Sequence, residues 1–178
     1  MTSDRSLARL FFAAWPAPEL QEKLGGLAQE LKRECGGRAT AASNIHLTMA
    51  FLGDVERSRV ARFESIAASI KARRFALLVE HVEYWQHNRI VWAGVSGCPD
   101  ALQALVKDLG GALAPEGFRP ERRPYVPHIT LLRNARRAPL ASAIAPIGWP
   151  VSRLALVESV RREGSRTYEV LREWPLDA

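Results

Sequence analysis

Cysteine is scarce in this chain, and long apolar runs are missing from it. Among its 178 residues there are two cysteines, Cys35 and Cys98, too few for a disulfide framework and without metal-ligand spacing. No apolar run approaches the roughly 20 residues that span a membrane. The apolar stretch 10–15 is too short for a secretory signal, and the residues before it include Asp4 as well as Arg9. We therefore expect a reduced, cytoplasmic protein that is neither secreted nor inserted in a membrane.

Acidic residues are outnumbered by basic ones. The chain has 19 Asp and Glu against 25 Lys and Arg, a net charge of +6, and most of the basic residues are arginine. A planar guanidinium group matches the oxygens of a phosphate, so this balance favours a nucleotide or nucleic-acid ligand. An arginine-rich coding bias would give the same composition without any function. The hydrophobic fraction of 47% is ordinary for a globular chain, and the length predicts one compact, two-lobed domain over residues 1–178.

Hydrophobic periodicity predicts strands that interleave with helices. Helical spacing of apolar residues occurs in three segments, 18–35, 56–73 and 99–113. Strands are expected at 7–14, 44–51, 75–85, 89–96, 128–131, 151–160 and 166–174. Proline-bearing loops are expected at 115–127 and 134–150. Because several of the strands form hairpins, the sequence predicts an α+β fold with mainly antiparallel sheets.

One four-residue pattern, His–apolar–Thr–apolar, occurs twice, at 46–49 and at 128–131. Alternation at period two is typical of a half-buried strand, so His and Thr share one face and the apolar residues point into the core. Each copy therefore presents one imidazole and one hydroxyl to the same space. The two copies lie far apart along the chain, in separate halves. We expect the halves to meet so that His46 and His128 converge on one substrate.

Two imidazoles on either side of a phosphate can cleave a phosphodiester with water, because one takes a proton from the water and the other protonates the leaving oxygen. Thr48 and Thr130 are placed to stabilise the nonbridging oxygens, and Arg133 could add a bidentate contact. Metal binding is the alternative chemistry for paired histidines. Neither copy has a third ligand in suitable spacing, so no metal and no cofactor are predicted.

On these residues the chain resembles the two-histidine phosphoesterase superfamily, and within it the bacterial RNA 2′,3′-cyclic phosphodiesterases, historically called 2′-5′ RNA ligases. Other family-like stretches are 9–13, 48–53, 127–133 and 157–168. The resemblance implies a bilobal fold with pseudo-twofold symmetry, in which two small antiparallel sheets backed by helices surround a central cleft. It also implies metal-independent hydrolysis of a terminal 2′,3′-cyclic phosphate on RNA or a nucleotide to a 2′-phosphate, with possible reverse 2′-5′ ligation.

The resemblance further implies a role for each residue of the two motifs. His46 would be the acid that expels the ribose O3′, and His128 the base that activates water. Thr48, Thr130 and Arg133 would bind the phosphate.

Stacking of the terminal base is implied for Phe51. A regular strand would put Phe51 on the core side, so this role requires a bulge or a strand end there. The arginines that flank the second motif, Arg119, Arg122, Arg123, Arg136 and Arg137, could follow the phosphates of a longer RNA. A solvated basic loop is the alternative for these arginines.

A binding module for RNA ends or nucleotides, with little turnover, remains the alternative function. A monomer is expected. His81 and His87 lack the repeated pattern, so we expect packing on a strand for the former and exposure in a turn for the latter.

Overall fold

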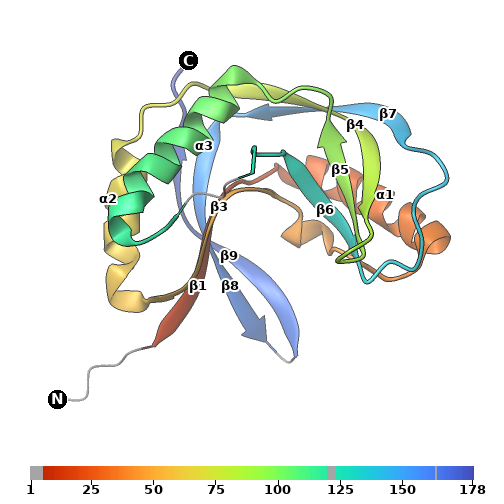
Figure 1. Ribbon diagram of the computed structural model, residues 1–178, viewed down its shortest axis with the longest axis horizontal. Helices are drawn as coiled ribbons and strands as arrows, with labels where there is room; N and C mark the ends of the chain where they lie inside the picture. Colours follow the sequence, from red (N-terminus) through yellow and green to blue (C-terminus); the bar gives the residue numbers. More distant parts are fainter. Residues whose placement is uncertain (1–5, 120–122, 163) are drawn as a thin grey trace.

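The computed structural model describes residues 6–119, 123–162 and 164–178, and within these ranges nine strands form two sheets (Figure 1). Sheet A has the order β3-β1-β8-β9, with bounds Leu47–Glu56, Leu7–Ala14, Arg153–Arg162 and Ser165–Pro175. Sheet B has the order β2-β6-β5-β4-β7, with bounds Arg38–Ala39, His128–Arg133, Ile90–Val95, Phe75–Trp85 and Ala143–Val151. Every neighbouring pair is antiparallel, which confirms the predicted α+β class.

In the same ranges, three α-helices back the sheets: α1 (Pro18–Cys35), α2 (Val60–Ser69) and α3 (Asp100–Leu113). Short 3₁₀ turns lie at Ala42–Asn44, Arg57–Arg59 and Ala114–Glu116. Helix α1 follows a strand of sheet A but contacts β2 and β6 of sheet B, whereas α3 follows a strand of sheet B but contacts β3 of sheet A. Figure 1 shows α2 and α3 together at one end of the molecule and α1 at the other. The two halves therefore exchange helices.

The main core is one continuous cluster of buried apolar side chains that includes residues of both sheets and all three helices. The helical stripes expected from periodicity supply it, for example Leu24, Leu31, Leu102 and Leu109. Each sheet packs one of its faces against this core. We call the opposite face, which points away from the core, the inner face of the sheet. A smaller apolar cluster lies on the inner face of sheet A and consists of Phe11, Ala13, Ala155 and Val157.

Two expected boundaries were wrong. The first motif strand, expected at 44–51, does not end at Phe51: the φ of 71° at Gly53 accommodates an irregularity, and β3 continues to Glu56. The helix expected at 56–73 is consequently shorter, because a 3₁₀ turn precedes it and α2 spans only Val60–Ser69.

Two strands were missed. Residues 143–151 were expected to be a loop because of Pro146 and Pro150, but they form β7 at the edge of sheet B. An edge strand needs hydrogen bonds on one side only, so it tolerates residues without an N–H. The other missed strand is the two-residue β2, which pairs with the end of β6.

Candidate active site

The two motifs lie on strands that contact each other, β3 of sheet A and β6 of sheet B. Their apolar positions are buried as predicted, with Met49 at 4% exposed and Leu131 at 0%. The imidazoles and hydroxyls are half-buried on the opposite, inner faces. The sheets therefore present both His–Thr pairs away from the core.

Both motif strands carry a β-bulge at the same place, the fourth residue of the motif. Strand β1 pairs with Thr48 and Ala50 of β3 and skips Met49. Strand β5 pairs with Thr130 and Leu132 of β6 and skips Leu131. An extra residue reverses the alternation of faces that follows it, so the side chain five positions after each histidine returns to the inner face. This matched irregularity supports a pseudo-twofold relation between the halves.

The bulges explain the positions of two predicted site residues, Phe51 and Arg133, each five positions after its histidine. Phe51 is 56% exposed instead of buried, and the guanidinium carbon of Arg9 lies 4.8 Å from its ring centroid. Arg133 is exposed at the end of β6. In an unbroken strand Phe51 would point into the core, so the bulge that its predicted role required is present.

The backbone fixes the same tautomer in both histidines. His46 Nδ1 lies 2.7 Å from the carbonyl oxygen of Asn44, and His128 Nδ1 lies 2.9 Å from that of Val126. A carbonyl oxygen can only accept, so each Nδ1 carries a hydrogen and each neutral Nε2 has its lone pair available. His46 Nε2 accepts from the Thr48 hydroxyl at 3.0 Å. His128 Nε2 has no hydrogen-bond partner in the described ranges.

Aromatic rings enclose His46. The indole of Trp15 stacks on the imidazole, with centroids 5.3 Å apart and planes 9° apart. Tyr168 meets the imidazole edge-on at 5.0 Å, and Phe11 lies 4.8 Å away. Trp15 extends the alternation of Phe11 and Ala13 beyond the end of β1, a signal that could have been read from the sequence.

This enclosure makes the His46 imidazolium unfavourable. Burial lowers the pKa of His46 to about 4, against the opposing effect of its hydrogen bond to Asn44. The positive charge of Arg133, and that of His128 when it is protonated, lower the pKa further. These electrostatic effects decay with distance, so Arg133 and His128 of sheet B lie near His46 of sheet A.

Two tryptophans pack near the ring of His128. The centroid of Trp85 lies 4.7 Å from that of the imidazole, in an edge-to-face arrangement, and Trp92 lies 6.1 Å away. A register shift in β4 between Val79 and His81 also turns His81 to the inner face, where its ring packs 5.9 Å from that of Trp92.

Tyr125 was not anticipated from the sequence, although it joins the two motifs. Its hydroxyl donates to the backbone oxygen of Thr48 at 2.8 Å, and burial raises the pKa of this phenol. The bond ties the proline-bearing loop before β6 to β3. Its position three residues before His128 carries no periodic signal, because the loop is irregular.

The arginines predicted to contact RNA in the loop before β6 show no interaction with the two histidines within the described residues. Arg119 and Arg123 are exposed in the loop before β6, and no interaction in the described part of the chain joins them to either histidine. Arg122 lies outside the described residues. His87 is exposed in the turn after β4, as expected.

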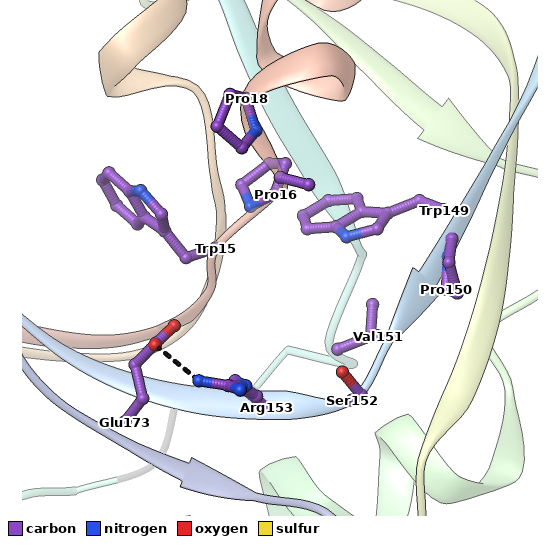
Figure 2. A pocket seen from close by; sticks show the side chains of 10 residues that line it. Trp15, Pro16, Pro18, Trp149, Pro150, Val151, Ser152, Arg153 and Glu173 are labelled. Carbon is purple, nitrogen blue, oxygen red and sulfur yellow. Dashed lines mark hydrogen bonds and ion pairs between the residues drawn. The ribbon is translucent and has the colours of Figure 1, made fainter.

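A cavity of about 330 Å³ lies beside the site, and neither histidine lines it (Figure 2). Trp15 and Trp149 face it from two sides, and the ion pair of Arg153 and Glu173, 3.3 Å long, closes a third.

In the described ranges, no three His, Cys, Asp or Glu side chains form a metal-binding group. No helix there is long and apolar enough to cross a membrane.

Comparison with known proteins agrees with this geometry. The family model of the 2′-5′ RNA ligase superfamily matches residues 16–163. The chain is 33% identical to the RNA 2′,3′-cyclic phosphodiesterase of Escherichia coli (strain K12), over 94% of this chain and 96% of that protein. Crystal structures of E. coli LigT superpose with TM-scores of 0.88 for the 3′-AMP complex and 0.80 for the phosphate complex. Their sequences are 31% and 29% identical to this chain, respectively. The superpositions cover 96% and 97% of this chain and 99% of each LigT chain. The chain belongs to the 2′-5′ RNA ligase superfamily.

Proposed function

We propose that this protein hydrolyses 2′,3′-cyclic phosphates at RNA ends and leaves a 2′-phosphate. The observation that carries the proposal is the matched pair of imidazoles, His46 and His128, each with Nδ1 bound to the carbonyl two residues earlier. Relatives named for this reaction over nearly the whole length of the chain support it. The complete motifs argue against a mere binding module, because a module that only binds RNA ends does not need two titratable groups.

In the proposed mechanism, His128 Nε2 takes the proton of the attacking water and His46 protonates the leaving O3′. With a pKa of about 4, His46 is neutral in the free protein, with roughly one molecule in 10³ protonated at pH 7. An anionic phosphate beside Nε2 favours the imidazolium, so the acid forms when the substrate binds. The carbonyl of Asn44, 2.7 Å from Nδ1, also stabilises it.

Thr48, Thr130 and Arg133, all on the inner faces, bind the phosphate oxygens. Negative charge accumulates on these oxygens in the transition state. The exposed ring of Phe51 stacks the terminal base. We further propose that the chain acts as a single two-lobed monomer without a metal, in the cytoplasm. The unpaired thiols of Cys35 and Cys98 suit a reducing compartment.

The direct assay is opening of a 2′,3′-cyclic mononucleotide in the presence of EDTA, with the product identified by ³¹P NMR. Only the 2′-monophosphate should form. The His46→Ala and His128→Ala variants should each lose about 10²–10⁴-fold in kcat, whereas His87→Ala, in an exposed turn, should turn over normally. A 3′-monophosphate product, or activity that requires added metal, would reject the proposal. Tight RNA binding without hydrolysis would favour the binding module.

A substrate with sulfur in place of the bridging O3′ separates the two roles. A thiolate leaves without protonation because the pKa of a thiol, about 8.5, is far below that of a ribose hydroxyl. This substrate should restore activity to His46→Ala and not to His128→Ala. If the substrate instead restored activity to His128→Ala, His128 would be the acid and His46 the base.

A further inference from the structure

We propose that Arg38 and Arg89 extend the phosphate site at Arg133 into a track for the single-stranded RNA that carries the cyclic end. The inference rests on the proposed function. It specifies the substrate class, an oligoribonucleotide whose upstream phosphates lie on sheet B, in preference to a cyclic mononucleotide.

Arg38 lies directly beside Arg133. The two residues are partners in the antiparallel register of β2 and β6, and directly opposite residues project to the same face. Since the bulge at Leu131 turns Arg133 to the inner face, Arg38 projects there too. Both side chains are exposed. Two arginine side chains therefore project from neighbouring positions at the end of the strand that begins with His128.

The glycine turn before β2 allows the strand to lie this close to β6. Gly36 and Gly37 have φ of 71° and 82°, a region that favours glycine. A Cβ on Gly37 would lie 2.6 Å from the carbonyl oxygen of Arg133 and 2.8 Å from the nitrogen of Ala135. Only glycine allows so close an approach of the two backbones. The short strand is thus held against the end of β6 by backbone contact.

Arg89 reaches the same end of β6 from the turn between β4 and β5. Its φ is 56°, and its carbonyl oxygen accepts from the nitrogen of Ala135 at 3.0 Å. Its guanidinium donates to the side-chain oxygen of Asn134 at 3.4 Å, the residue after Arg133. Two loops from different parts of the chain therefore converge on this point, and each supplies an exposed arginine.

The charge at this end of sheet B is not neutralised. In the described part of the chain, no carboxylate forms an ion pair with any of the three arginines. Glu34 is occupied elsewhere, since its carboxylate accepts from the backbone nitrogen of Leu140. Exposed guanidinium groups that have no carboxylate partner match the repeated anions of a phosphodiester backbone.

A single strand fits this surface better than a duplex. The track adjoins the residue that would hold the terminal phosphate, so its occupant is continuous with an RNA end. The half-buried ring of Trp85 lies against His128, and stacking on aromatic rings beside a basic groove is how proteins hold unpaired nucleotides.

Binding at increasing salt tests the track. The probe is a fluorescent octaribonucleotide ending in a 2′-phosphate, which resembles the product and is not turned over. Each phosphate contact to a single strand contributes about 0.7 to the slope of log K against log salt, so the Arg38→Ala/Arg89→Ala variant should lose roughly 1.4. Over a fourfold rise in salt, wild type should therefore lose about sevenfold more affinity than the variant. The ratio of kcat/KM for a cyclic-ended oligonucleotide to that for a cyclic mononucleotide should also fall.

Lys107→Ala is the matched control, because it removes one charge from the exposed side of α3. It should leave the slope and both substrates unaffected. An unchanged slope in the double variant, or an equal loss in Lys107→Ala, would overturn the track. A duplex probe bound as tightly as the single strand would overturn the choice of occupant. If wild type binds the probe but opens no cyclic phosphate, the proposed function fails. The difference in salt dependence between wild type and the double variant then still tests whether Arg38 and Arg89 contact the RNA.

Discussion

Lowering the pH from 7 to about 4.5 should reduce the free energy of unfolding by about 2–3 kcal/mol through His46 alone. The folded-state pKa of His46 is about 4, below the roughly 6.5 of an unfolded histidine. Between these values the unfolded chain binds more protons than the folded one. The stabilising contribution is therefore complete above the unfolded pKa and is lost as the pH falls toward the folded pKa.

The magnitude follows from the difference in pKa. A tenfold difference in proton affinity corresponds to about 1.4 kcal/mol, so the fall in pKa from roughly 6.5 to about 4 gives about 3 kcal/mol in full, most of which is lost by pH 4.5. The physical origin is the stack of Trp15 and the edges of Phe11 and Tyr168, which leave little room for water around an imidazolium.

Urea denaturation of wild type and His46→Gln at both pH values measures this contribution. Other groups titrate in both proteins and cancel in the difference, so wild type should lose about 2–3 kcal/mol more than the variant. The His87→Gln protein, altered in an exposed turn, should behave like wild type. Equal pH dependence in wild type and His46→Gln would refute the claim that the fold encloses a neutral imidazole.

Thr48→Val should lower kcat/KM about 10- to 100-fold. The substitution removes a hydroxyl that donates to His46 Nε2 at 3.0 Å and, with substrate bound, to the phosphate. Steady-state rates within about twofold of wild type would contradict this. Gly94→Ala should destabilise the protein by about 1–3 kcal/mol in urea, because the new methyl would lie 2.5 Å from the His81 ring. Gly148→Ala, with nothing within 4 Å, is its control, and equal losses would reject that reasoning. Tyr125→Phe removes the 2.8 Å bond to the Thr48 carbonyl and should cost about 1 kcal/mol, seen as a lower urea midpoint; an unchanged midpoint would show that the bond adds nothing.

Periodicity was sufficient to place the two motifs. Alternation at period two assigns His46 and Thr48 to one face and buries Met49, and the helical stripe of α1 has the predicted bounds, Pro18–Cys35. These patterns depend only on residues that are neighbours along the chain, which is the information that a single sequence carries.

The parts that depend on partner strands could not be derived in this way. The bulges that turn Phe51 and Arg133 to the inner face arise from the register with β1 and β5, which the motif does not encode. Strand β7 was missed because its prolines are acceptable only at a sheet edge, and edge position is a property of the assembled sheet. Arg38 was overlooked since two residues are too few to show any period.

NMR of ¹⁵N-histidine-labelled protein, titrated with a nucleoside 2′-monophosphate, tests most directly whether the two imidazoles share one phosphate. The Nε2 resonances of His46 and His128 should move together along one binding curve with a single dissociation constant. Movement of only one resonance, or of the two with different dissociation constants, would show that the histidines do not face a common phosphorus.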